Sequence, residues 1–219
     1  MKICGITNTR DAQVAAEAGA DAIGLNFYSG SPRCCTLEVA KEIAAALGPR
    51  VCKVGVFVNA AADEIRSAAE SVPLDAVQLH GDEPPDFLRA IRALPIVRAM
   101  RFGDDLAPID AYLAACHRLL AMPRMLLLDA SRGGQFGGTG TPIDWALLAA
   151  NRRHLGGLPL VLAGGLTPDN VAAAIGAVRP WAVDVASGVE IAPGSKSPQL
   201  VVHFVSAAKK AFEKLSARD

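Results

Sequence analysis

The sequence is poor in aromatic residues, which make up 5% of its 219 residues, although hydrophobic residues as a whole make up 51%. Such a composition does not suit a platform on which single-stranded nucleic acid stacks its bases. The net charge is zero, because 22 Lys and Arg residues balance 22 Asp and Glu residues. No run of basic residues stands out either. Nucleic acid and anionic membrane surfaces are therefore poor candidate partners, whereas a small anionic substrate needs only a local site.

Cysteines are few and follow no recognisable pairing pattern. The five cysteines are Cys4, Cys34, Cys35, Cys52 and Cys116. Their number is odd, and no Cys-x-x-Cys or Cys/His ligand spacing occurs. This pattern indicates reduced thiols and predicts no zinc site.

Long apolar runs are absent as well. The longest, about residues 155–166, is interrupted by glycines and a proline and is too short to span a bilayer. The N-terminal residues lack the apolar stretch of a signal peptide. The sequence therefore predicts a soluble, cytoplasmic protein that does not bind membranes.

Eight β-rich segments alternate with helical patterns along the whole chain. The expected strands are residues 2–5, 22–27, 52–58, 76–79, 96–100, 125–129, 160–163 and 183–187. Apolar residues at helical spacing predict helices within residues 62–72, 87–94 and 201–215. Expected helix starts are marked by Asp63, Asp144 and Thr167-Pro168.

This alternation indicates a parallel sheet, because parallel neighbours need crossover connections. Eight units in a chain of 219 residues are typical of a (β/α)8 barrel. No linker or composition shift divides the chain, so residues 1–219 are expected to form one α/β domain, a (β/α)8 barrel of the phosphate-binding type. The alternative is an open doubly wound sheet, which usually has fewer strands.

In such a barrel, function lies at the carboxyl ends of the strands. The first predicted strand ends in Cys4-Gly5, where a thiolate could act as base or nucleophile. The alternative for Cys4 is a small buried hydrophobic residue. The sixth strand ends in Asp129 after three leucines, a costly position for a carboxylate unless it is used or paired. A helix cap or a structural ion pair would also explain Asp129.

Glycines follow the last three predicted strands. Residues 133–140 form a glycine-rich stretch that is either a mobile lid or a plain linker. Gly164-Gly165 and Ser187-Gly188 follow the seventh and eighth strands, where barrels often bind phosphate through backbone N–H groups. Tight turns that happen to need glycine are the alternative.

Other polar residues are candidates for a pocket. Gln78 and His80 share one face of the fourth strand, which suggests a polar pocket or a satisfied core network. Arg33 lies in a turn-rich loop and could grip a carboxylate. An inward Lys2 would need a counter-ion, for which Asp184 is the candidate if the eighth strand neighbours the first.

Together these pieces resemble the phosphoribosylanthranilate isomerase family. The matching stretches are Lys2-Ile3-Cys4-Gly5-Ile6-Thr7, Ser31-Pro32-Arg33, Val54-Gly55-Val56-Phe57, Val77-Gln78-Leu79-His80-Gly81-Asp82-Glu83, Gly138-Thr139-Gly140 with Asp144-Trp145, Leu162-Ala163-Gly164-Gly165-Leu166, Val183-Asp184-Val185-Ala186-Ser187-Gly188-Val189-Glu190, and Pro193-Gly194. Each is weak alone, but they follow in order along nearly the whole chain.

The resemblance implies an Amadori rearrangement of a phosphorylated aminosugar in tryptophan biosynthesis, without metal or other cofactor. It implies that Cys4 is the general base, that Asp129 is the general acid and that Arg33 holds the anthranilate carboxylate. It also implies that Asp184 lines the site near the sugar. The implied phosphate ligands are Gly164, Gly165, Ser187 and Gly188. A monomer and a homodimer are both compatible with the sequence.

Three competing functions remain open at this point. The related isomerase of histidine biosynthesis would be expected to use two carboxylates and two phosphate sites, against which Cys4 argues. A Schiff-base lyase or aldolase needs a lysine at a strand's carboxyl end, and neither Lys2 nor Lys53 is placed there. A catalytically inactive phosphate-binding barrel is the third, and the presence of both Cys4 and Asp129 argues against it.

Overall fold

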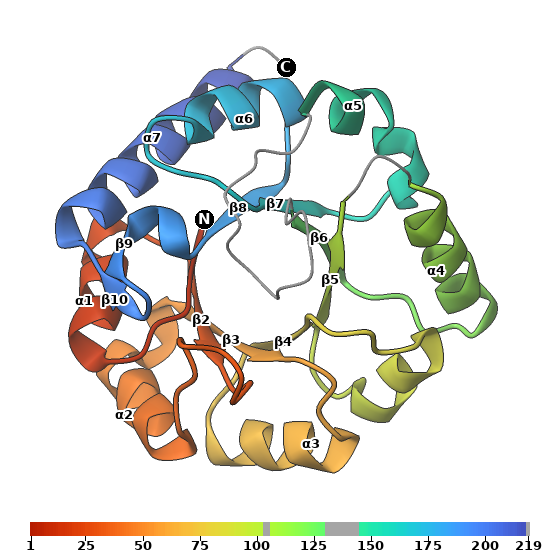
Figure 1. The fold of residues 1–219 in the computed structure, drawn as a ribbon, viewed down its shortest axis with the longest axis horizontal. Coiled ribbons are helices and arrows are strands. Elements are labelled where there is room, and N and C mark those ends of the chain that lie inside the picture. Colours follow the sequence, from red (N-terminus) through yellow and green to blue (C-terminus); the bar gives the residue numbers. More distant parts are fainter. Residues whose placement is uncertain (103–105, 130–144, 218–219) are drawn as a thin grey trace.

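A computed structural model describes residues 1–102, 106–129 and 145–217. Eight parallel strands close into a barrel in sequence order, with the last strand paired to the first (Figure 1). The strands are β1 (Lys2–Cys4), β2 (Ala22–Asn26), β3 (Cys52–Phe57), β4 (Ala76–Leu79), β5 (Ile96–Arg101), β6 (Met125–Asp129), β7 (Leu160–Ala163) and β8 (Ala182–Val185). The predicted (β/α)8 barrel is therefore confirmed, and the open sheet is excluded.

Helices form a ring outside the strands (Figure 1). The α-helices are α1 (Thr9–Ala18), α2 (Leu37–Leu47), α3 (Ala62–Ser71), α4 (Ala107–Arg118), α5 (Trp145–Ala150), α6 (Val171–Val178) and α7 (Pro198–Ser216). Short 3-10 helices are η1 (Gly48–Arg50), η2 (Pro85–Ile91), η3 (Arg152–Leu155) and η4 (Ser187–Val189), and a small hairpin joins β9 (Glu190–Ala192) to β10 (Ser195–Lys196).

The predicted α-helix between β4 and β5 is wrong, because this connection is the 3-10 helix η2. It starts at a proline and buries Leu88 and Ile91. These two residues are three apart, and residues at this spacing lie one above the other in a 3-10 helix. The apolar spacing alone therefore did not distinguish the two helix types.

Two of the predicted helix starts are also displaced, and the third, at Asp144, lies outside the described residues. Asp63 lies in the first turn of α3, whose N-cap is Ala61. Helix α6 begins at Val171 with Asn170 as N-cap, not at Thr167-Pro168. The Asn170 side chain accepts a hydrogen bond from the Thr167 N–H at 2.8 Å and donates one to the Gly165 carbonyl at 2.9 Å. This turn separates the glycines after β7 from the helix.

The barrel interior is divided between apolar and polar residues. An apolar cluster of Val97, Ala99, Leu127, Val161 and Ala163 comes from β5, β6 and β7. The buried polar residues Lys2, Gln78 and Asp184 come from β1, β4 and β8. The apolar cluster thus comes from three adjacent strands, and the polar residues come from strands on both sides of it.

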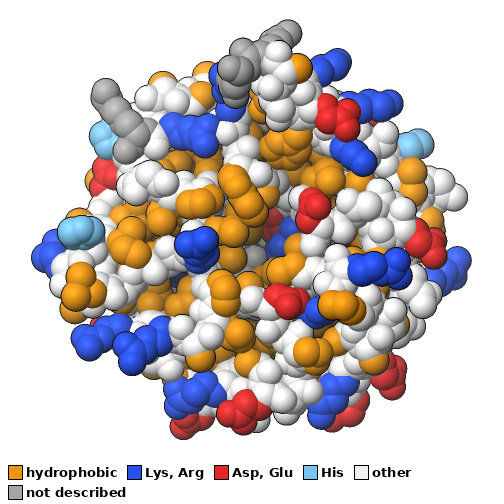
Figure 2. All heavy atoms as spheres, turned by 180° about the vertical axis from the view of Figure 1, so that it is seen from behind, with side chains coloured by type: hydrophobic (Ala, Val, Ile, Leu, Met, Phe, Trp, Pro, Cys, Tyr) orange, Lys and Arg blue, Asp and Glu red, His pale blue; other side chains and the backbone are white. Residues whose placement is uncertain are grey.

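The end of the barrel where the strands begin is lined by hydrophobic side chains (Figure 2). They surround a cavity of about 430 Å³, whose wall includes Val54, Val97, Leu127 and Trp181. Among the described helices, none is long and apolar enough to cross a membrane.

Candidate active site

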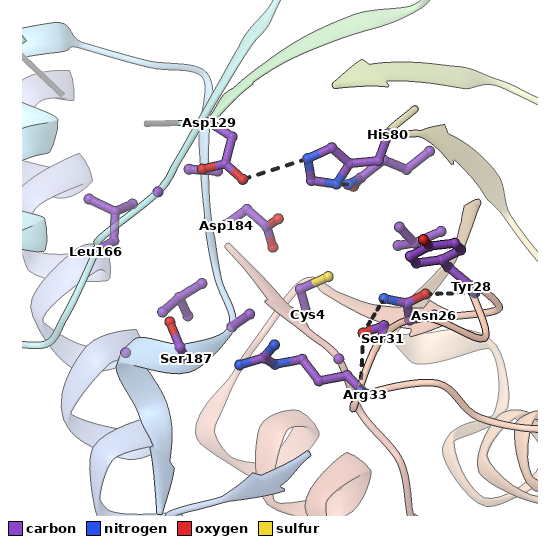
Figure 3. Close-up of a pocket in the computed structure, with 18 of the residues that line it drawn as sticks. Cys4, Asn26, Tyr28, Ser31, Arg33, His80, Asp129, Leu166, Asp184 and Ser187 are labelled. Atoms are coloured by element: carbon purple, nitrogen blue, oxygen red, sulfur yellow. Dashed lines mark hydrogen bonds and ion pairs between the residues drawn. The ribbon is translucent and has the colours of Figure 1, made fainter. Parts of the chain in front are cut away.

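A cavity at the carboxyl ends of the strands brings together every residue predicted from the sequence for the site (Figure 3). Those residues are Cys4, Arg33, Gln78, His80, Asp129, Gly164, Gly165, Asp184, Ser187 and Gly188. Residues 133–140, the predicted lid or linker, lie outside the described part of the chain. The ring order of the strands places Cys4 on β1 and Asp129 on β6, three positions apart around the barrel.

Space for the Cys4 side chain comes from a glycine on the neighbouring strand. Cys4 pairs in register with Gly24 of β2. A Cβ atom at Gly24 would lie 2.6 Å from the Cys4 Sγ and 3.2 Å from the Lys2 Cε. Gly24 was not predicted as a site residue, because its role depends on the register of two strands.

The Lys2 ammonium lies beside Cys4 in the barrel interior. It donates hydrogen bonds to the Asp184 Oδ2 at 2.9 Å and to the Gln78 Oε1 at 3.0 Å. Burial lowers the pKa of Lys2, but the charges of Asp184 and Cys4 outweigh burial, so the net effect is a raised pKa. The structure thus contains the expected Lys2–Asp184 ion pair, and both side chains are less than one-tenth exposed.

Burial is the largest influence on the Cys4 thiol and raises its pKa above the ordinary value of 9.0. Lys2 and Lys196 oppose this shift, while the negative charge of Asp184 adds to it. Because its pKa is raised, Cys4 is largely protonated near neutral pH in the empty site. A protonated thiol is a weaker base and nucleophile than a thiolate.

The expected result of alkylating Cys4 with iodoacetamide is a pH midpoint above that of the same cysteine in the urea-unfolded chain. The reason is that only the thiolate reacts and burial disfavours it. Mass spectrometry of the tryptic peptide of residues 3–10, or of residues 1–10 where Lys2 is replaced, reports Cys4 alone. Lys2→Met should move the midpoint still higher because it removes a stabilising cation. A folded-state midpoint at or below the unfolded one would contradict this prediction.

On the opposite wall, His80 lies between Gln78 and Asp129. Its Nδ1 is 3.3 Å from the Gln78 Nε2, and its Nε2 is 3.6 Å from the Asp129 Oδ2. Gln78 is almost fully buried, with 1% of its surface exposed. The pocket predicted from Gln78 and His80 is thus also part of a connected polar network.

Arg33 is held by a carboxylate that had no predicted role. Its Nε and Nη2 donate to the two Glu190 carboxylate oxygens at 2.9 and 2.7 Å. The Lys196 Nζ donates to the same Glu190 at 2.8 Å. Burial raises the pKa of Glu190, but hydrogen bonds from Arg33 and Lys196 outweigh it and lower the pKa overall. Glu190 lay within a matching motif, but the pairing joins positions 157 residues apart.

The Arg33 stem crosses the end of β1. A Cβ atom at Gly5 would lie 2.6 Å from the Arg33 Cδ, and Gly5 has a φ of +73°. Gly5 therefore allows both the local backbone conformation and the passage of the arginine.

The four residues Gly164, Gly165, Ser187 and Gly188, here called the anion loops, follow β7 and β8. Gly164 and Gly165 have φ values of +86° and +65°, a region that favours glycine. Among the backbone hydrogen bonds found in the described loops and turns, none is donated by the N–H of Gly165. Unpaired N–H groups at a cavity wall can donate to an anion.

Across the described residues, no group of three or more His, Cys, Asp or Glu side chains is arranged to hold a metal ion. The arrangement instead combines one thiol, one carboxylate on the opposite wall and a set of backbone donors. Such a site can exchange protons with two positions of a bound anionic molecule.

Comparison with known proteins identifies relatives over almost the whole chain. The model of the N-(5'-phosphoribosyl)anthranilate (PRA) isomerase family matches residues 1–207. The N-(5'-phosphoribosyl)anthranilate isomerase of Rubrobacter xylanophilus is 47% identical over 95% of this chain and 98% of its own.

Solved structures agree. Phosphoribosyl anthranilate isomerase from Thermotoga maritima is 40% identical, with a TM-score of 0.84 over 95% of this chain and 98% of its own. A phosphoribosyl anthranilate isomerase in complex with reduced 1-(o-carboxyphenylamino)-1-deoxyribulose 5-phosphate is 39% identical, with a TM-score of 0.82 over 95% and 97% of the two chains. With its barrel and its sequence both shared along nearly their full length, this chain belongs to the N-(5'-phosphoribosyl)anthranilate isomerase family.

Proposed function

We propose that this chain catalyses the Amadori rearrangement of N-(5'-phosphoribosyl)anthranilate to 1-(2-carboxyphenylamino)-1-deoxyribulose 5-phosphate, a step of tryptophan biosynthesis. Cys4 is the general base and Asp129 the general acid. The observation that carries the proposal is that Cys4 and Asp129 line one cavity from strands on different sides of the barrel, together with the anion loops. One acid and one base flanking a phosphorylated sugar are sufficient for this reaction.

The reaction begins at the sugar ring oxygen. Asp129 gives it a proton, the bond from this oxygen to C1′ breaks, and the nitrogen lone pair forms an iminium with C1′. The Cys4 thiolate then removes the proton from C2′. The electron pair of that C–H bond forms a C1′–C2′ double bond, and the iminium π electrons return to nitrogen. The product of this step is an enolamine.

The enolamine becomes the ketone by losing its hydroxyl proton at the C2′ oxygen and gaining a proton at C1′. Cys4, which gave its own proton to solvent when it ionised, is then back in its protonated resting form, and a proton from solvent returns to the ionised Asp129. No electrons leave or enter the substrate, so this balance needs no redox cofactor.

The Cys4 base has to be ionised when it acts. Burial raises the pKa of Cys4 in the empty site, whereas a cation nearby favours the thiolate. The substrate iminium supplies such a cation directly next to the proton to be removed. Lys2 and Lys196 support the same form, since both lower the pKa of Cys4.

Two groups hold the anionic ends of the substrate. The backbone donors of the anion loops bind the phosphate, because glycine lets the backbone approach closely. Arg33 holds the anthranilate carboxylate. Glu190 occupies its Nε and one side of Nη2, which leaves the Nη1–Nη2 edge of the guanidinium for a bidentate contact.

Gly188→Ala is expected to raise KM for the substrate about 10- to 100-fold, with a smaller change in kcat, because hydrogen bonds to a charged group each contribute about 1.5–3 kcal/mol. A Cβ atom at Gly188 would lie 1.8 Å from the Leu166 carbonyl oxygen, so the two anion loops must separate. Steady-state kinetics measure both constants.

Gly176→Ala is the matched control for this variant. Gly176 lies in α6, and nothing stands within 4 Å of a Cβ atom placed there. It should leave KM unchanged. If the Gly188→Ala protein folds and keeps the wild-type KM, the substrate phosphate does not bind at the anion loops.

The proposed function is tested by adding N-(5'-phosphoribosyl)anthranilate to the purified protein and following the loss of its anthranilate-type fluorescence. Turnover with saturation kinetics is expected. No turnover would point to an inactive phosphate-binding barrel. A higher kcat/KM for the bis-phosphorylated aminosugar of histidine biosynthesis would point to that isomerase instead.

A further inference from the structure

A chain of five polar side chains, four of which line the cavity, crosses the barrel. Lys2 contacts Asp184 and Gln78, Gln78 contacts His80, and His80 faces Asp129. We call these five residues the polar chain. It starts beside the proposed base and ends at the proposed acid, and the proposed reaction leaves its middle members without an assigned task.

The direction of each hydrogen bond in the polar chain follows from chemistry. A lysine ammonium only donates, so the atom of Gln78 that lies 3.0 Å from the Lys2 Nζ is the amide oxygen. The amide nitrogen of Gln78 therefore faces the other way, toward the His80 Nδ1 at 3.3 Å. An amide nitrogen also only donates, so the His80 Nδ1 has to accept.

A neutral histidine carries one proton on one of its two ring nitrogens. Because the Nδ1 accepts from Gln78, the proton of neutral His80 sits on Nε2. This N–H points at the Asp129 Oδ2, 3.6 Å away (Figure 3). Such a contact is long for a hydrogen bond, and contacts of this kind often tighten when substrate binds.

We infer that Lys2, Gln78 and His80 are positioning residues that decide which oxygen of Asp129 carries the acidic proton. Lys2 orients the Gln78 amide, and Gln78 selects the Nε2–H form of His80. His80 then directs that N–H to the Asp129 Oδ2. In a protonated carboxyl group the carbonyl oxygen is the stronger acceptor, so the oxygen that accepts from His80 is the one without the acidic proton. The proton that Asp129 delivers therefore sits on Oδ1. This inference rests on the proposed role of Asp129 as general acid.

The tautomer of His80 can be read directly by ¹⁵N NMR of histidine-labelled protein at a pH where the ring is neutral. The chain has four histidines, and the His80→Gln variant assigns the His80 signals by their loss. The expected spectrum shows a protonated Nε2 and an unprotonated Nδ1. In Gln78→Met the two forms should become mixed, because Nδ1 has lost its donor.

Kinetics test whether this geometry serves the acid. His80→Ala should lower kcat at least about tenfold with KM changed by less than about threefold. His80→Gln should recover most of the activity, because the glutamine amide nitrogen can lie where the histidine Nε2 was. Gln78→Met should lower kcat in the wild-type background but have little further effect in His80→Ala, since both changes remove the same contact.

Gln13→Met is the matched control, because it makes the same exchange on an exposed position of α1. It should leave kcat, KM and the His80 spectrum unchanged.

A wild-type His80 protonated on Nδ1 would overturn the inference without any variant, so it stays testable even if Gln78→Met does not fold. A higher KM at unchanged kcat in His80→Ala or Gln78→Met would also overturn it and assign these residues to substrate binding. The tautomer is measured without substrate. Lack of turnover by the wild-type protein would therefore contradict the proposed function alone.

Discussion

Replacing Cys4 with alanine is expected to lower kcat about 10²- to 10⁴-fold, the range typical for removal of a general base. The side chain does not hold the phosphate or the carboxylate, so KM should change little. Cys4→Ser should fail as well, because a serine hydroxyl is a far weaker base than a thiolate. The measurement is kcat for both variants with phosphoribosylanthranilate, after circular dichroism has shown that they remain folded.

Cys52→Ala is the matched control, because Cys52 begins β3 at the opposite end of the barrel and should be dispensable for turnover. Near-normal kcat in folded Cys4→Ala would make Cys4 a packing residue. The base would then have to be sought elsewhere in the cavity, with Asp184 as the next candidate. One of its oxygens, Oδ1, is buried without a recorded partner among the described residues.

Asp129→Asn is expected to lower kcat by a similar factor of about 10²–10⁴, because asparagine keeps the shape of the side chain but cannot deliver the proton to the ring oxygen. Its amide can still fill the position next to His80, so the barrel should remain intact. Steady-state kinetics should show kcat and kcat/KM falling together, as expected when an interaction specific to the transition state is lost.

Asp75→Asn is the control for this change of charge. Asp75 pairs with Lys53 near the start of β3, away from the cavity, and is half-exposed. A kcat of Asp129→Asn close to that of the wild type would exclude Asp129 as the acid. The double variant Cys4→Ala/Asp129→Asn should lose less than the product of the two single losses, since both groups act on one substrate.

Local sequence patterns were sufficient to predict most of the strands and their bounds. The predicted strands 76–79, 125–129 and 160–163 have the bounds found in β4, β6 and β7. Four others differ by one residue at the carboxyl end, and the predicted strand 183–187 differs from β8 by one residue at its start and two at its end. The connection through η2 was the exception. The α-helix was predicted from Phe87, Ile91 and Leu94, which are four and three residues apart, whereas the 3-10 helix buries Leu88 and Ile91, which are three apart. The prolines and the shortness of this connection are visible in the sequence, but the helix prediction rested on the apolar spacing.

Some residues of the candidate site could likewise be predicted from the sequence, and others could not. Cys4, Asp129 and the anion loops could be proposed from the sequence, because each lies where a strand ends and such ends meet at one face of a barrel. The partners that orient them could not. Gly24 makes room for Cys4 only because of strand register, and Glu190 reaches Arg33 only through the folding of the segment after β8.

By itself the sequence determined the alternation of strands and helices, the identity of the groups at the strand ends and the membership of a family. The alternation of strands and helices is visible in side-chain spacing within a few residues, and the strand-end groups and family motifs are read directly from their positions along the chain. Only the tertiary structure decided that Lys2 meets Asp184 across 182 positions and that Gln78 then turns its amide toward His80. Barrel closure pairs the first strand with the last, and no local pattern carries the register of that pairing.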